Sequence, residues 1–191
     1  MEKFEVMLSI VKEDLYRYTG EISYKAFKQA LKIPGFKFTF ALRKIQHSKK
    51  LSFSGIYYRL LFQRYMYRYG FQMPNFTKIG KGFYIGHFGN IVINGKAVIG
   101  NWCNISQGVT IGETFRGPKK GTPRIGNEVW IGTNSVIVGN IKIGSNVMIA
   151  PLTFVNIDIP DNSLVIGNPC QIIPKSNATE GYINNIYNKK V

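Results

Sequence analysis

Aliphatic residues recur at every sixth position through the second half of the chain. The run is unbroken from residue 125 to residue 155, and before it the same period survives one two-residue slip and one insertion. A helix with 3.6 residues per turn cannot keep such a period on one face. The positions in phase are Ile79, Ile85, Ile91, Ile93, Ile99, Ile105, Ile111, Ile125, Ile131, Ile137, Ile143, Ile149 and Val155.

Glycine directly follows many of these aliphatics, as at Gly100, Gly126 and Gly144. A flat, alternating strand needs no glycine at that place, whereas a bend does. We therefore expect each six-residue unit to form one short strand and one bend, with about three units in a triangular coil. Stacked coils bury ladders of aliphatic side chains that no single coil could bury. About four to five coils are expected between residues 75 and 165.

The first 70 residues follow a helical pattern instead. Leu8, Val11 and Leu15 recur at helical spacing, and further helices are expected over residues 38–45 and 56–69. The last of these mixes aromatic residues with three arginines. Two interpretations stay open: a packing helix whose arginines face solvent, or a basic aromatic face that rests on a membrane or binds an acidic substrate. The arginines are Arg59, Arg64 and Arg68.

Charge and composition narrow the class of protein. The chain has 191 residues, 25 Lys and Arg against 10 Asp and Glu, and a net charge of +15, which suggests nucleic acid, an acidic membrane surface or a polyanionic ligand as partner. Two cysteines make no disulfide framework, and two histidines make no three-histidine metal cage. The first residues lack a signal-peptide pattern and no apolar run is long enough to span a membrane, so we expect a cytoplasmic protein, with contact to the inner face of the membrane left open.

Four motifs carry a resemblance to a known family: GHFGNIVIN, GVTIG, PRIGNEVWIGTNSVIVGNIKIG and VIGNPCQII. The chain resembles the hexapeptide-repeat acyltransferases, in the serine acetyltransferase branch, which also includes sugar O-acetyltransferases of capsule and exopolysaccharide synthesis. The resemblance implies a mainly β fold, a left-handed parallel β-helix over residues 71–173 after an α-helical region over residues 1–70. Residues 174–191 are expected to form a C-terminal tail, of which the polar stretch 177–191 is expected to be loosely ordered. In the family, three chains form a homotrimer, and acetyl-CoA lies in a groove between neighbouring β-helices.

His87 is the one histidine in the repeat region, and it stands where a bend residue would suffice. Transfer of an acetyl group from a thioester to a hydroxyl needs a base, and an imidazole serves that purpose at neutral pH. The acceptor attacks the thioester directly, so no covalent enzyme intermediate is needed. His87 also matches the family's catalytic histidine. The family's orienting carboxylate is matched here by Gln72, which can accept the same hydrogen bond without a charge; a backbone carbonyl is the alternative.

The residues that match the family's amino-acid-binding positions carry no charge. The aspartate before the catalytic histidine is matched by Gly86, and an Arg–His pair is matched by Gly121 and Thr122. This argues against L-serine and for a neutral acceptor such as a sugar. Asn94 and the inserted loop, with Arg116, are the expected acceptor-binding residues; a solvated surface loop is the alternative.

The family resemblance also implies an acetyl-CoA site and no metal. Its matching positions are Thr133, Pro151, Gly167, Asn168 and Pro169, with phosphate contacts expected from Lys175, Lys119 and Lys120. Pro151 has no N–H, so we expect the amide contact there to shift by one residue. The expectation for Trp102 and Trp130 is either groove lining or packing. Cys103 and Cys170 are expected to be structural.

The expected function is an acetyl-CoA-dependent O-acetyltransferase that acts on a sugar hydroxyl in surface polysaccharide synthesis, with His87 as general base. The alternative is a serine O-acetyltransferase of cysteine biosynthesis. A third hypothesis, a basic scaffold for nucleic acid or membrane, is disfavoured because the cationic residues are diffuse and form no nucleic-acid module. A γ-type carbonic anhydrase shares the solenoid but needs three histidine ligands.

Overall fold

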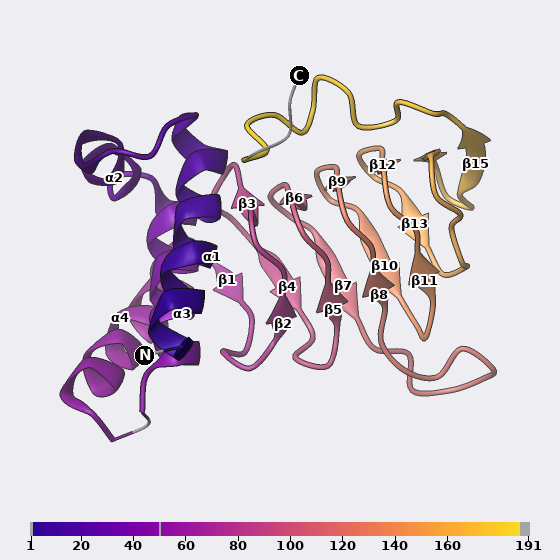
Figure 1. The fold of residues 1–191 in the computed structure, drawn as a ribbon. Coiled ribbons are helices and arrows are strands. Elements are labelled where there is room, and N and C mark those ends of the chain that lie inside the picture. The colour runs from indigo at the N-terminus through magenta and orange to yellow at the C-terminus, as the bar shows by residue number, and fades with distance from the viewer. Residues whose placement is uncertain (1, 50, 188–191) are drawn as a thin grey trace.

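The computed structural model describes residues 2–49 and 51–187 (Figure 1). Four helices form one end of the molecule, and a coil of short strands extends from them. The helices are α1 (Glu2–Thr19), α2 (Tyr24–Ala30), α3 (Pro34–His47) and α4 (Phe53–Tyr69). Within these ranges, no helix is both long enough and apolar enough to cross a bilayer.

Three sheets make up the strand region, and each turn of the chain adds one strand to each sheet. Sheet A contains β1 (Phe71–Gln72), β4 (Ile91–Ile93), β7 (Thr110–Gly112), β10 (Val136–Val138) and β13 (Phe154–Val155). Sheet B contains β2 (Lys78–Ile79), β5 (Val98–Ile99), β8 (Arg124–Ile125) and β11 (Lys142–Ile143). Sheet C contains β3 (Tyr84–Ile85), β6 (Asn104–Ile105), β9 (Val129–Ile131), β12 (Val147–Ile149), β14 (Ser163–Ile166) and β15 (Gln171–Pro174).

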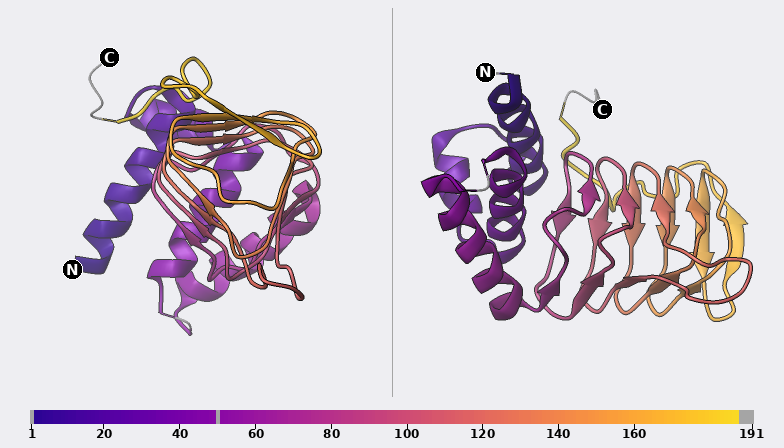
Figure 2. Two further views of the ribbon diagram at one scale, coloured as in Figure 1. Left: turned by 90° about the vertical axis from the view of Figure 1, so that its right-hand side faces the viewer. Right: turned by 90° about the horizontal axis from the view of Figure 1, so that it is seen from below.

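The three sheets wrap into the predicted left-handed β-helix, and Figure 2 shows its triangular cross-section. Strand pairs are parallel except for the antiparallel β14–β15 hairpin at the end. The aliphatics predicted to stack are in register, as in the ladder of Ile99, Ile125 and Ile143 in sheet B. A matching ladder in sheet C begins at Ile85 and Ile105. All of the aliphatics predicted to stack are buried except Ile79, which is half-buried and packs against the same core, so the six-residue period correctly predicted the core.

The bends use glycine for a reason that the repeat alone did not reveal. A Cβ at Gly100 would collide with the carbonyl oxygen of Gly126 in the next coil, so the coils approach each other too closely there for a side chain. Gly100 itself has no positive φ, and the left-handed backbone positions are shared between other glycines, such as Gly82 and Gly108, and non-glycine residues. Some of the non-glycine residues are asparagines, such as Asn134 with φ of 58°, and others are bulky, such as Trp102 with φ of 54° and Leu152 with φ of 60°.

The helices close the open end of the solenoid. Arg43 of α3 is buried; its Nε lies 2.8 Å from Oδ2 of Asp14 on α1, and its Nη1 donates to the carbonyl of Ile79 at 2.8 Å. Its Nη2 donates to the carbonyl of Gly80, and Asp14 accepts the N–H of Phe83 at 3.1 Å. The first coil has no preceding coil to pair with, so these two side chains satisfy its backbone groups.

The tail is packed rather than loose, which corrects the expectation for residues 177–187. It runs back over the outer face of sheet C toward α1 (Figure 2). The Tyr182 ring lies 4.9 Å from Trp130, and the Tyr182 carbonyl accepts from Asn104. The Tyr187 ring packs on Tyr16 of α1 at 5.4 Å. Residues 188–191, which also belonged to the expected loose tail, lie outside the described residues.

Candidate active site

One edge of the β-helix gathers most of the residues that the family resemblance singles out. We call it the C–A edge: the bends that follow β3, β6, β9, β12 and β14, at residues 86–90, 106–109, 132–135, 150–153 and 167–170. Backbone hydrogen bonds join successive bends, as from Leu152 N–H to the Thr133 carbonyl at 2.9 Å. The structure thus brings His87, Thr133, Pro151 and the Gly167–Asn168 turn onto one edge.

His87 stands on a two-residue insertion in that edge. Ile85 pairs with Ile105, and Val92 pairs with Thr110. The chain therefore advances seven residues between these pairs in the first coil but only five in the second, which leaves two extra residues in the first coil. Gly89 lies against Gln107 of the next coil, so the surplus falls on His87 and Phe88, which are both exposed. The two-residue slip in the repeat is therefore the device that projects the imidazole from the wall.

No hydrogen bond to the His87 imidazole is formed by residues 2–49 or 51–187 of the chain. Gln72, the predicted orienting residue, lies on β1 between two buried side chains, Phe71 and Met73, and its own side chain is exposed on the outer face of sheet A. Within one chain Gln72 is not bonded to His87, so its orienting role stays a prediction.

The expected phosphate-binding lysines lie away from the C–A edge of their own chain, so their contact with acetyl-CoA stays a prediction. Lys175 follows β15, and its N–H donates to the Asn162 carbonyl at 2.7 Å, at the opposite edge of sheet C from Gly167. Lys119 is paired with Asp158, Nζ to Oδ2 2.8 Å, and this hydrogen bond holds the pKa of Asp158 below its ordinary value. Lys120 is exposed on the same loop as Lys119, far across sheet A from the C–A edge.

Both tryptophans pack away from the C–A edge, so the packing interpretation holds for them. Trp102 lies at the bend between sheets B and C, where its Nε1 donates to Glu13 of α1 at 3.3 Å. Lys81 Nζ lies 5.1 Å from the centre of its ring. Trp130 lies beneath Tyr182 of the tail.

The inserted loop, residues 113–123, leaves the β-helix between sheets A and B. Thr114 and Gly121 pair across its base, with N–H to carbonyl distances of 3.0 and 2.9 Å. Asn94 Nδ2 donates to Glu113 at the start of the loop at 3.3 Å. The expected acceptor residues therefore fall into two groups: Gly86 lies beside His87, whereas the others lie at the far edge of sheet A. That second group is Asn94, Arg116, Gly121 and Thr122.

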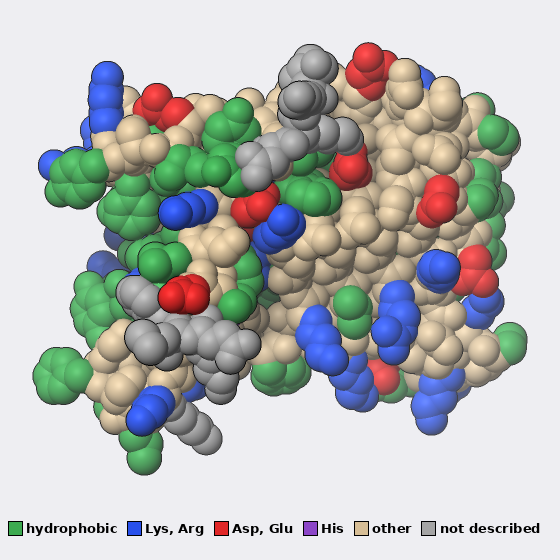
Figure 3. All heavy atoms as spheres, viewed as in Figure 1, with side chains coloured by type: hydrophobic (Ala, Val, Ile, Leu, Met, Phe, Trp, Pro, Cys, Tyr) green, Lys and Arg blue, Asp and Glu red, His purple; other side chains and the backbone are tan. Residues whose placement is uncertain are grey.

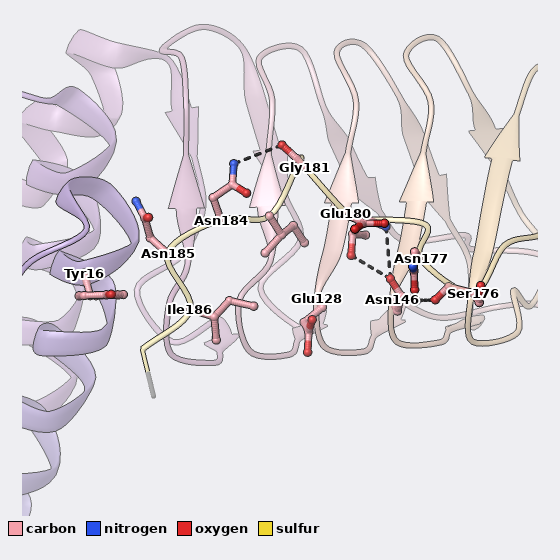
Figure 4. A pocket seen from close by; sticks show the side chains of 12 residues that line it. Tyr16, Glu128, Asn146, Ser176, Asn177, Glu180, Gly181, Asn184, Asn185 and Ile186 are labelled. Carbon is pink, nitrogen blue, oxygen red and sulfur yellow. Dashed lines mark hydrogen bonds between the residues drawn. The ribbon is translucent and has the colours of Figure 1, made fainter. Parts of the chain in front are cut away.

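A cleft under the C-terminal tail was not predicted from the sequence. It has a volume of about 660 Å³ and lies between the tail and the bends that join sheets B and C (Figure 4). Asn146, Glu128 and Tyr16 line it on one side, and tail residues such as Asn184 line the other. It was missed because the tail was expected to be loose. His87 is not among the residues that line this cleft.

Two other chemistries are not supported by these residues. Burial raises the pKa of the Cys103 thiol to about 12, so this thiol stays protonated at neutral pH and is no nucleophile. Burial also raises the pKa of Cys170. In the described ranges, no three His, Cys, Asp or Glu side chains are grouped so as to hold a metal ion.

Comparisons with known proteins agree with this geometry. Residues 122–156 match the bacterial transferase hexapeptide model of six repeats. A serine acetyltransferase of Synechococcus elongatus is 37% identical over 100 residues, 52% of this chain and 41% of the relative. The crystal structure of Neisseria gonorrhoeae serine acetyltransferase superimposes with a TM-score of 0.71 at 30% identity, over 89% of this chain and 67% of that one. The structure of soybean serine acetyltransferase complexed with serine superimposes with a TM-score of 0.71 at 28% identity, over 87% of this chain and 69% of that one.

These relatives correct the expected acceptor. The sugar acceptor, and with it a role in polysaccharide synthesis, was inferred from the missing charges at Gly86, Gly121 and Thr122, but the relatives found are serine acetyltransferases. Uncharged residues at three matching positions do not exclude a charged acceptor, because the loop carries charges of its own at Glu113 and Arg116. The chain spans about half or less of the length of these curated relatives. On its repeats, its fold and its structural neighbours, it belongs to the hexapeptide-repeat acyltransferases, in the branch of the serine acetyltransferases.

Proposed function

We propose that this protein transfers an acetyl group from acetyl-CoA to the hydroxyl of L-serine, with His87 as the general base. The observation that carries the proposal is the exposed imidazole on its two-residue insertion, at the edge that also bears Thr133, Pro151 and Gly167. The similarity to serine acetyltransferases supplies the acceptor.

In the proposed reaction, an unprotonated nitrogen of His87 accepts the proton of the serine hydroxyl while the oxygen attacks the thioester carbon. The carbon–oxygen bond forms and the carbon–sulfur bond then breaks. The CoA sulfur leaves as a thiolate and takes the proton from the imidazolium, which restores the base. Acetyl-CoA and serine together supply all the atoms of the products, so the chain has only to position the two substrates and transfer one proton.

The C–A edge offers mainly backbone groups to acetyl-CoA, and one bend offers fewer donors than expected. Pro151 has no N–H, and the N–H of Leu152 is already donated to the Thr133 carbonyl at 2.9 Å. The expected shift of an amide contact from Pro151 to its neighbour therefore finds no free donor. We assign the binding of the pantetheine arm to the carbonyls of this bend and to the side chain of Thr133.

We propose that three copies assemble through sheet A. The C–A edge of one copy would then lie next to the opposite edge of sheet A of its neighbour. The outer face of sheet A is uncharged, with Gln72, Val92 and Thr110 in register. Sheet B instead presents Lys78, Arg124 and Lys142 on β2, β8 and β11, and Figure 3 shows Lys and Arg side chains over this part of the β-helix. The tail covers sheet C. Sheet A is thus the face that a neighbour can cover without burying charge.

This arrangement brings the loop of one copy toward His87 of another. The loop of the neighbouring copy would also supply charged partners for the carboxylate and the ammonium group of L-serine. Arg116 and Lys120 are exposed on the loop and suit the serine carboxylate, and Glu113 at its base suits the ammonium group. Glu113 already accepts from Asn94 at 3.3 Å and lies 3.4 Å from Lys96 Nζ, so it is held in place before serine binds.

The proposal is tested by the acceptor dependence of CoA release. L-serine should stimulate thiol release from acetyl-CoA, and Arg116→Gln should raise KM for serine about tenfold or more with a smaller change in kcat, because one charged contact is lost. Lys142→Gln, which removes a cation from sheet B, is the matched control and should change neither constant. An enzyme that L-serine does not stimulate, or a pair of variants with equal KM, contradicts the proposal.

A further inference from the structure

Helix α4 presents a stripe of five large, exposed side chains, four apolar or aromatic and one arginine, that nothing in the described chain covers. The stripe comprises Phe53, Tyr57, Leu60, Arg64 and Tyr67, spaced alternately four and three residues apart, so its members share one side of the helix. Phe53 is 95% exposed, Leu60 62% and Tyr67 88%. Figure 3 shows hydrophobic side chains at the surface of this helical end. Single exposed apolar residues are ordinary, but a contiguous stripe marks an interaction surface.

The other side of α4 already serves the core. Phe62 is buried and stacks on Phe38 of α3, with ring centres 4.7 Å apart. Gly55 is buried as well. The helix is therefore apolar on both sides while only one side is packed. The α4 stripe makes no contribution to the packed core of the chain, so we infer that it contacts a partner outside the described residues.

The charge around the α4 stripe identifies the chemistry of that partner. Residues 22–112 contain 14 Lys and Arg and not one Asp or Glu. The ion pairs of the described residues involve Arg43, Lys81, Lys96 and Lys119, and none involves an arginine of α4. The surface thus calls for an anionic partner.

A second copy of the chain is a poor occupant for the same reason. Two α4 stripes facing each other would bring Arg64 and Arg68 against the same arginines, with no carboxylate in residues 22–112 to neutralise them. An anionic lipid surface supplies both requirements. Its phosphates accept from the arginines, and aromatic side chains enter the headgroup region.

We propose that α4 docks this protein on an anionic membrane surface, with Phe53, Leu60 and Tyr67 in the headgroup region and Arg64 and Arg68 on lipid phosphates. The helix lies on the bilayer and does not cross it, in agreement with its length and polarity.

Docking would also place the chemistry close to the membrane. α4 ends beside the insertion that carries His87: the Gly89 N–H donates to the Tyr69 carbonyl at 2.9 Å, and the Phe88 ring lies 6.4 Å from that of Tyr69. The proposal does not depend on the acceptor, so its test uses binding and not catalysis.

Sedimentation with vesicles tests the proposal. The full chain should co-sediment with phosphatidylglycerol/phosphatidylcholine vesicles, weakly with pure phosphatidylcholine, and less as salt rises. Arg64→Gln/Arg68→Gln should weaken binding about 30-fold, from roughly one kcal/mol for each cation. Arg124→Gln/Lys142→Gln on sheet B removes the same charge from exposed positions and should change binding less than about threefold.

An apolar pair completes the test. Phe53→Ser should lower vesicle binding about tenfold, and Phe115→Ser, which removes an equally large exposed ring from the loop, should not. Equal losses in the two charge pairs, or in the two Phe variants, would show diffuse attraction and overturn the proposal. So would absence of binding to anionic vesicles, or an oligomer that dissociates when Phe53 is replaced, since a second copy would then occupy the α4 stripe.

Discussion

Removal of the Arg43 side chain tests whether the helices act as the cap of the β-helix. Arg43 is 1% exposed, and in Arg43→Met its guanidinium is lost from Asp14 and from the carbonyls of Ile79 and Gly80. The remaining carboxylate of Asp14 keeps the N–H of Phe83 but loses its counter-ion in a buried site. Breaking a buried pair in this way costs about 3–5 kcal/mol of the free energy of unfolding.

That loss converts to a fall in Tm of about 6–20 °C for a chain of this size. Thermal unfolding followed by circular dichroism measures it directly. Lys119→Met is the control, because it breaks an ion pair of similar length, 2.8 Å to Asp158, in which both side chains are largely exposed. The control should cost less than about 1 kcal/mol.

A double variant separates the two contributions. Arg43→Met/Asp14→Asn removes the unpaired charge along with its partner, so it should be more stable than Arg43→Met alone. The reasoning is refuted if Arg43→Met unfolds at the same temperature as Lys119→Met, because the capping contacts would then contribute no more than a surface pair.

Three further outcomes follow from the packing. Burial raises the pKa of Cys103 to about 12, so iodoacetamide at pH 8 should modify the half-buried Cys170 first and Cys103 only in denaturant; equal rates would contradict this. Gly100→Ala should lower the free energy of unfolding, measured by urea denaturation, by about 1–3 kcal/mol because its Cβ meets the next coil, and an unchanged free energy would disprove the close approach. Tyr182→Ala should shift the emission of Trp130 to the red and speed proteolysis of the tail, whereas unchanged emission would mean that the tail does not cover sheet C.

The ladders could be predicted from the sequence because one local rule repeats in every coil. Each aliphatic faces inward and packs on the residue at the equivalent position of the next coil. The known period therefore places Ile99, Ile125 and Ile143 in register. The slip before Ile93 was visible in the same way, but its consequence was not. Only the pairing shows that the surplus residues project outward as His87 and Phe88.

The path of the tail could not be predicted because its contacts follow no period. The Asn104 side chain donates to the Tyr182 carbonyl across 78 positions of sequence, and Asn146 binds Thr179 across 33. Polar residues that make such contacts look the same in sequence as polar residues in solvent. For the same reason, the sequence did not show that Lys175 lies at the opposite edge of sheet C from Gly167.

The acceptor was predicted wrongly because missing charges were given too much weight. Gly86, Gly121 and Thr122 show only which groups the acceptor does not meet at those positions. The loop residues lie across sheet A from His87, so the full set of charges around the acceptor depends on how copies of the chain assemble. Neither the sequence of one chain nor its fold contains that arrangement.

The most direct measurement of the central claim is serine-dependent CoA release by the wild-type chain and by His87→Asn, followed with a thiol reagent. We expect L-serine to drive release in the wild type, and His87→Asn to lower kcat by about 10²–10⁴-fold with little change in the Tm, because the exposed imidazole supports chemistry and not the fold. Release that does not depend on L-serine, or a His87→Asn variant with wild-type kcat, would contradict the claim.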